Sequence, residues 1–414
     1  MSKKALPLLS LALLAGCTVA TPSSSEGAAS SPPASSAEPS APASSYSSEA
    51  QNPESESSSS QEEYLFTPKV GEVRKWFDHG TFGESKFYNY CPSVFVEDNV
   101  KHVYYCTNKL EGNVTDYVGY REGALRGDSF EFTSTENLSY LLSPTKDTWD
   151  SRHTCDPSVV KGKFKMGGET YSYLMAYLGC VTSDNSLNEV GIAVSKSPSG
   201  PFVKVDAANP LVPYDPDQAA WGTGQPSVVS IDGEGKVALF YSVGNKTGTY
   251  TEVREYDLSD LGSPKLVRTK KVSTYGLSDT VLCNADFAYD ETNKRILMVK
   301  GRQPFGKDGK TPNFIADTLD VYAMDDSAST NRYDEVFKGN NANDWVKIGT
   351  IDESLTGFAR NHNAGFVTDP YGCLIEKDRV EVAFTRSDYG ESTDWSYLTT
   401  YRIYSTSIGL TYVK

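Results

Sequence analysis

Short apolar segments bounded by turn residues recur from about residue 64 to the end of the chain. They are rich in β-branched and aromatic side chains and are flanked by Gly, Asn, Asp or Pro, which is typical of β-strands. The pattern predicts an all-β domain with strands at Ser93–Glu97, Lys101–Tyr105, Tyr171–Tyr177, Val190–Ser195, Lys236–Ser242, Arg295–Val299 and Val380–Thr385.

A polar or turn-like cluster leads directly into an apolar strand at five places. These are Tyr90–Phe95, Thr154–Val160, Gly224–Val229, Cys283–Ala288 and His362–Val367. A spacing of roughly 60 to 80 residues is too long for a solenoid repeat but suits a four-stranded propeller blade with its loops. The sequence therefore predicts a five-bladed β-propeller, and the residues that enter the innermost strands should meet at one mouth of the central channel.

Two predicted hairpins would place cysteines opposite each other. With a turn near Asp98-Asn99, Cys91 falls opposite Cys106. In the second predicted hairpin, with its turn at Gly167-Gly168, Cys155 falls opposite Cys180. Exported proteins can keep disulfides. We expect both bonds, with Cys91 as a structural half-cystine and not a nucleophile.

The other cysteines carry less information. The sequence leaves open whether Cys283 and Cys373 pair. Because the chain has only four His and no clustered Cys/His spacing, a zinc site is not expected.

The N-terminus predicts export and lipidation. Lys3 and Lys4 precede a short apolar run, and Leu14-Ala15-Gly16-Cys17 resembles a lipobox, so residues 1–16 are interpreted as a signal peptide and Cys17 as the lipidated residue. The alternative is an ordinary secretory signal. Residues 17–63 are rich in Ser, Pro and Glu and predict a disordered tether, with the propeller at 64–414. We expect an extracytoplasmic protein, anchored by lipid to the outer face of a bacterial cell membrane.

Charge narrows the range of partners. The formal net charge of −15 argues against nucleic acid and against an anionic membrane surface. The 26 Tyr are compatible with stacking on sugars, although propeller strands are rich in Tyr for structural reasons. We expect a monomer whose partner is an oligo- or polysaccharide.

Two segments carry a resemblance to a known group of enzymes. The run Leu187–Phe202, which follows Asp156-Pro157-Ser158-Val159, resembles a blade of the five-bladed propeller glycosidases, which include family 43 arabinanases and xylosidases and the invertase-like enzymes. The run Arg360–Gly372 is similar to the arabinanase segment in which a His-Asn pair opens the last blade. The resemblance covers residues 64–414 loosely.

That resemblance implies three acids at the channel mouth, of which this chain retains one. Inverting members use a general base on the first blade, an orienting Asp on the second and a Glu general acid on the third. Asp156 matches the second position, whereas Cys91-Pro92 stands at the first and Gly224, followed by Gln225, at the third.

Other side chains could complete a site. Asp286 could act with Asp156 and His362 in catalysis, or could be a structural acid that caps strand ends. Candidate substrate-binding residues are Arg152, His153, Gln225, Arg302, Arg360 and Asn363. His362 could be a proton donor, a neighbour of a Ca²⁺ ion in the central channel, as the resemblance implies, or a hydrogen-bonded filler of that channel. No cofactor is required.

These features leave three functions open. The protein could be a glycosidase with a non-standard set of acids, a non-catalytic glycan-binding lipoprotein or a protein-interaction propeller. A glycosidase predicts two carboxyl groups near the mouth, and a binding module predicts one acid or none.

Overall fold

The computed structural model describes residues 68–77, 87–109, 113–126, 129–132, 139–217, 219–303, 315–387 and 400–411. The predicted signal peptide, Cys17 and the tether lie outside these residues and stay predictions. No helix within the described ranges is both long and apolar enough to cross a membrane.

The domain is all-β, as predicted, and three of its sheets have four antiparallel strands each. The first contains β7 (His153–Met166), β8 (Glu169–Cys180), β9 (Glu189–Ser195) and β10 (Val203–Lys204). The second contains β11 (Ala219–Ser230), β12 (Lys236–Asn245), β13 (Gly248–Asp257) and β14 (Lys265–Lys271). The third contains β15 (Ala285–Asp290), β16 (Arg295–Gly301), β17 (Leu319–Asp325) and β18 (Val346–Ile351).

The fourth sheet has nine strands and divides into two antiparallel groups. One group contains β2 (Asn89–Glu97), β3 (Val100–Asn108), β4 (Asp116–Arg126), β5 (Ser129–Phe132) and β6 (Ser139–Leu142). The other contains β19 (Arg360–Thr368), β20 (Arg379–Ser387), β21 (Arg402–Gly409) and β1 (Arg74–Lys75). A short parallel contact between β19 and β2 joins them. The 3₁₀ segment η2 (Glu335–Asn341) and the helical turn α1 (Glu353–Thr356) lie in connections between strands.

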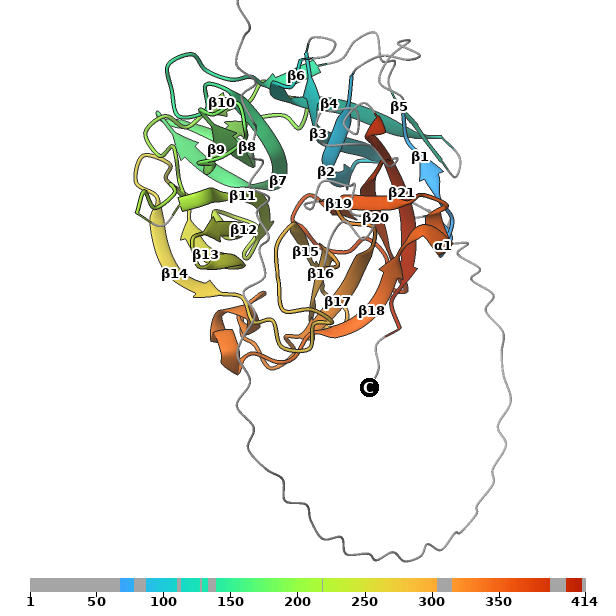
Figure 1. Cartoon of the computed structure of the whole chain (residues 1–414). Helices are drawn as coiled ribbons and strands as arrows, with labels where there is room; N and C mark the ends of the chain where they lie inside the picture. The colour runs from blue at the N-terminus through green and yellow to red at the C-terminus, as the bar shows by residue number, and fades with distance from the viewer. Residues whose placement is uncertain are drawn as a thin grey trace, which may run out of the picture. The chain divides into compact units, whose positions relative to one another are not determined.

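The strand groups follow one another around a common centre in chain order, with β2, β7, β11, β15 and β19 facing it (Figure 1). The early strand β1 pairs with β21, so the first and last parts of the domain share one group. This propeller-like arrangement agrees with the prediction. The number of blades stays an interpretation, because two groups are joined in one sheet.

Packing between neighbouring sheets explains why the middle strands are almost continuously apolar. In β12 and β16 side chains on both faces are buried, because each sheet packs against the sheets before and after it. Phe240 of β12 stacks on Phe287 of β15 with ring centroids 3.8 Å apart. The core therefore lies between the sheets, and the inner strands are left to line the centre.

Both predicted hairpins form, but bulges shift their registers. Ser93 pairs with Tyr104 as predicted, and then an irregularity makes Tyr90, instead of Cys91, the partner of Cys106. Two irregularities in the pairing of β7 with β8 place Cys155 opposite Leu178. A bulge inserts an unpaired residue and so moves every later pair along the strand.

The predicted disulfides Cys91–Cys106 and Cys155–Cys180 are therefore wrong. The structure has one disulfide among its described residues, between Cys106 and Cys155, which links β3 to β7. Cys91 and Cys180 are not disulfide-bonded, nor are Cys283 and Cys373.

A segment after β19 crosses the far ends of three inner strands. The carbonyl oxygens of Pro370, Tyr371 and Gly372 accept hydrogen bonds from the backbone N–H groups of Lys161 in β7, Ser230 in β11 and Tyr289 in β15. These contacts hold the inner strands together at the end of the centre opposite the polar clusters.

Candidate functional site

Each of the five polar clusters contains a non-glycine residue in the left-handed region of the backbone. The φ angles are 52° for Cys91, 46° for Asp156, 51° for Gln225, 48° for Asn284 and 41° for Asn363. A positive φ is uncommon outside glycine, so its recurrence at the start of five inner strands marks one shared local structure.

The clusters converge on a small, partly open pocket, as the sequence predicted. Its walls come from all five inner-strand segments and combine small apolar residues with polar ones. The lining residues are Cys91, Pro92, Ser93, Pro157, Gln225, Pro226, Asn284, Ala285, Asp286, Asn363 and Ala364. Among these residues there is no aromatic or Arg side chain, and Asp286 is the only acid.

Residues two positions after the left-handed residues form a chain of hydrogen bonds between neighbouring inner strands. Ser93 Oγ accepts from Val159 N at 3.2 Å, and Ser158 Oγ accepts from Val228 N at 2.9 Å. Ser227 Oγ accepts from Phe287 N at 3.1 Å, and Asp286 Oδ2 accepts from Phe366 N at 2.8 Å.

The fifth member of this series is Gly365. A Cβ atom there would lie 2.2 Å from the carbonyl oxygen of Pro92, so only glycine allows β19 to approach β2 so closely. Asp286 thus holds a structural position that Ser occupies in three other strands. Its catalytic role stays a prediction, and the left-handed position of its strand belongs to Asn284.

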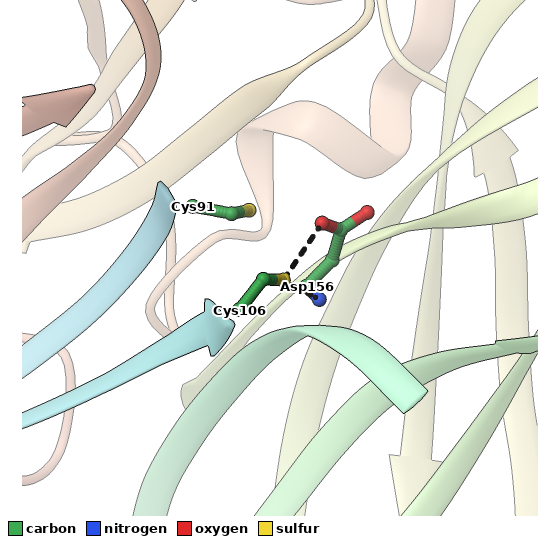
Figure 2. Close-up of side chains that lie close together, drawn as sticks. All are labelled: Cys91, Cys106 and Asp156. Carbon is green, nitrogen blue, oxygen red and sulfur yellow. Dashed lines mark hydrogen bonds between the residues drawn. The ribbon is translucent and has the colours of Figure 1, made fainter. Parts of the chain in front are cut away.

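Asp156 lies in a sulfur-rich cluster between β2, β3 and β7 (Figure 2). Its carboxyl Oδ1 is 3.5 Å from Cys106 Sγ and 3.3 Å from Cys155 Sγ, and its backbone N–H donates to Cys106 Sγ at 2.8 Å. Cys91 Sγ points toward the same carboxyl group and lies within 4.8 Å of it and of Cys106 Sγ. Because Cys106 is in a disulfide, these three residues do not offer a set of free thiolates to a metal.

Burial sets the protonation of both acids. Desolvation raises the pKa of Asp156 to about 7, opposed by its hydrogen bond with Cys91. Desolvation raises the pKa of Asp286 to about 6, opposed by hydrogen bonds from Ser227 and from the Phe366 N–H group. Burial and the neighbouring charge of Asp156 raise the pKa of the Cys91 thiol well above its usual value. Both carboxyl groups can therefore hold a proton near neutral pH.

The structure brings together some of the predicted substrate-binding residues and not others. Gln225 and Asn363 line the pocket. His153 is instead buried and bonded through Nδ1 to Asp116 Oδ2 at 2.7 Å. Arg302 donates to Asp320 at 2.7 Å. Arg152 and Arg360 are absent from the residues that line the pocket.

His362 is buried beside the mouth, although it does not line the pocket. Its Nδ1 accepts a hydrogen bond from Ala316 N at 3.2 Å. Burial, with the charge of Arg360, lowers its pKa to about 3, so the ring is neutral. Because Nδ1 accepts, the ring hydrogen is on Nε2, which is therefore a donor in this state and offers no lone pair to a cation. No group of three metal-binding side chains within the described ranges includes His362. Its metal and proton-donor roles stay predictions.

Sequence reasoning missed Asn284, the serine series and Tyr90. The signal for the series was present, since Pro-Ser-Val recurs at Pro92-Ser93-Val94, Pro157-Ser158-Val159 and Pro226-Ser227-Val228. Tyr90 Oη lies 3.0 Å from Cys155 Sγ, a contact that depends on the observed disulfide and on no local motif.

Comparison with known proteins defines the class of fold. No protein-family model matches the chain, and no curated protein matches its sequence. A family 117 glycoside hydrolase from Zobellia galactanivorans superposes with a TM-score of 0.50 at 13% identity, over 83% of this chain and 91% of that one. An endo-arabinase from Bacteroides thetaiotaomicron matches at 16% identity with a TM-score of 0.41, over 84% and 98% of the two chains.

The protein has the fold of the propeller glycosidases. At such low identity the likeness concerns the fold alone, and the activity has to be argued from the site.

Proposed function

We propose that this protein is a cell-surface lipoprotein that binds a carbohydrate at the pocket of its five-bladed propeller. The observation that carries the proposal is the pocket wall, in which left-handed residues of several inner strands present the amide side chains of Gln225, Asn284 and Asn363. An amide both donates and accepts hydrogen bonds, which suits the hydroxyl groups of a neutral sugar. The glycosidase-like fold supports the same class of ligand.

The site favours binding over hydrolysis because Asp286, the one acid among the lining residues, is engaged in the fold, and Asp156 is buried and does not line the pocket. Asp286 Oδ1 accepts from Ser227 Oγ at 2.6 Å, and its Oδ2 accepts from the backbone of β19. Asp156 is buried among sulfur atoms. The positions where the resemblance expects a base and an acid hold Cys91 and the Gly224-Gln225 pair.

The test is a glycan-binding measurement with a matched pair of variants. Asn363→Gly removes a pocket amide but keeps a residue that accepts a positive φ. Asn340→Gly changes an exposed Asn in η2. After an oligosaccharide is found by array screening, Asn363→Gly should weaken its affinity about tenfold, the loss of roughly one hydrogen bond. Equal affinities for the two variants would place the glycan site elsewhere.

Hydrolysis is a second candidate because Asp156 and Asp286 have raised pKa values near one pocket. A glycosidase needs one protonated and one ionised carboxyl group. If the protein hydrolyses aryl arabinosides, xylosides, galactosides or fructans, Asp156→Asn should lower turnover about 10²-fold or more while the fold is kept. Turnover that survives the substitution unchanged would remove Asp156 from the mechanism.

Anchoring and calcium binding remain separate proposals. Lipid attachment to Cys17 predicts that a fatty-acid label enters the wild type and not Cys17→Ala. Calcium beside His362 predicts a rise in the unfolding temperature on calcium addition that is lost in His362→Ala.

A further inference from the structure

The cluster around Asp156 holds a disulfide, a third sulfur and a carboxyl group in contact. Cys91 is half-buried and lines the pocket, whereas the sulfur atoms of the Cys106–Cys155 bond lie behind it. None of these contacts is needed for the glycan site proposed above. An unbonded cysteine beside a disulfide is the arrangement from which thiol–disulfide exchange proceeds.

We propose that Cys91, Cys106, Cys155 and Asp156 form a thiol–disulfide exchange site. In one state Cys106 is bonded to Cys155, which links two strand groups, and in the other state Cys106 is bonded to Cys91 within one hairpin. Cys91 Sγ is the attacking sulfur, Cys106 the central one and Cys155 the leaving one.

The step balances without an external oxidant or reductant. The Asp156 carboxylate takes the proton of the Cys91 thiol, and Cys91 Sγ attacks Cys106 Sγ. The Cys91–Cys106 bond forms as the Cys106–Cys155 bond breaks, and the electron pair of the broken bond stays on Cys155 Sγ. The proton held by Asp156 Oδ1, which lies 3.3 Å from Cys155 Sγ, completes the new thiol.

The surrounding groups fit these roles, and because burial raises the pKa of the Cys91 thiol, its thiolate forms only as the proton passes to Asp156. The Asp156 carboxyl group is close to all three sulfur atoms, so one group can take and return the proton. Tyr90 Oη lies 3.0 Å from the leaving sulfur and stays protonated, because burial raises its pKa well above the usual value. It can therefore donate a hydrogen bond to Cys155 as negative charge develops there.

The geometry of β2 also allows the alternative bond. Tyr90 pairs with Cys106, and Cys91 follows Tyr90 in the bulge, so Cys91 remains next to Cys106 although the two are not opposite each other. Exchange would release the covalent link between β3 and β7 and would change the pocket wall at Cys91.

Disulfide mapping of the full chain tests the proposal. Native protein is held at pH 8, quenched in acid, unfolded and labelled with N-ethylmaleimide in acid, and digested without reduction. We expect two linked peptides, Cys106–Cys155 and Cys91–Cys106, with the second at about 1–10% of the total, which is the population of an ordinary minor state. Cys91→Ser should give the first peptide alone, and Cys180→Ser should give both.

Three outcomes would overturn the proposal. The first is that the wild type gives the Cys106–Cys155 peptide alone after prolonged incubation. The second is that the share of the Cys91–Cys106 peptide rises with protein concentration. The third is that the Cys91–Cys106 peptide appears only together with links to Cys283 or Cys373, which mark scrambling. A second measurement uses Cys155→Ser. Mild oxidation of that variant should join Cys91 to Cys106 within one chain, and failure to do so in the folded variant also overturns the proposal.

Discussion

Two junctions between neighbouring strand groups are held together by different chemistry, although both have an Asp at their centre. At the junction of β3 and β7, a disulfide joins the strand groups, and Asp156 lies at the left-handed position beside it. At the junction of β15 and β19, the link is a hydrogen bond from the backbone of β19 to Asp286, two residues after the left-handed position. The two acids differ in register by two residues, and that decides their surroundings.

The difference shows that residue type alone does not determine the role of an acid at the mouth of the pocket. Asp286 replaces a serine in a series of inter-strand hydrogen bonds, so the fold uses its oxygen atoms. Asp156 belongs to no such series, and the same role in its strand is played by Ser158. Asp156 is therefore the acid whose chemistry is available to the neighbouring sulfur atoms.

The largest expected effect comes from breaking the covalent junction. The double variant Cys106→Ser/Cys155→Ser should lower the free energy of unfolding by about 3–4 kcal/mol, because the bond closes a loop between cysteines 49 residues apart. Urea unfolding of the wild type and of the double variant, both without reductant, measures this loss. A loss below about 1 kcal/mol would mean that the junction does not depend on the disulfide.

The hydrogen-bonded junction should respond less strongly and in a residue-specific way. Asp286→Ala leaves the Phe366 N–H group without its acceptor, so the free energy of unfolding should fall by about 2–3 kcal/mol. Asp286→Ser restores the residue found at the same position in three other strands and should recover most of the loss. Equal losses in the two variants would contradict the structural role assigned to this position.

The contribution of Asp156 to the stability of the protein should depend on pH. Its pKa is about 7 in the folded protein and near 3.8 when unfolded, so the folded state binds more protons between these values and its stability falls as the pH rises from 4 to 7. Asp156→Asn removes that contribution. The variant should therefore gain stability relative to the wild type as the pH increases, by on the order of 1 kcal/mol or more.

Urea unfolding at pH 4, 6 and 8 measures this difference. A stability difference between Asp156→Asn and the wild type that is constant with pH would show that Asp156 titrates as an ordinary acid.

The sequence predicted the strands, both hairpins and the convergence of the polar clusters, because alternation and turn residues are local signals. It could not predict the register beyond Ser93 in the first hairpin or beyond Phe164 in the second. The bulges at the starts of β2 and β7 place Cys91 and Asp156 at a positive φ, and Cys in particular gives no signal for that conformation. The predicted disulfide partners were wrong because they were counted from the predicted register. A hairpin can be counted from sequence, whereas contact between β3 and β7 depends on the packing of two sheets.

The smallest expected effect tests directly whether Cys180 is disulfide-bonded. Cys180 is buried but unbonded, and its sulfur lies 3.5 Å from the carbonyl oxygen of Thr182. In Cys180→Ser the new hydroxyl group can donate to the same oxygen, so the free energy of unfolding should change by no more than about 1 kcal/mol. Cys155→Ser is the matched comparison, because it removes the other cysteine of the pair that the sequence predicted. If Cys180→Ser were as destabilising as Cys155→Ser, the two cysteines would be bonded to each other, and the covalent junction would lie within the β7–β8 hairpin instead of between β3 and β7.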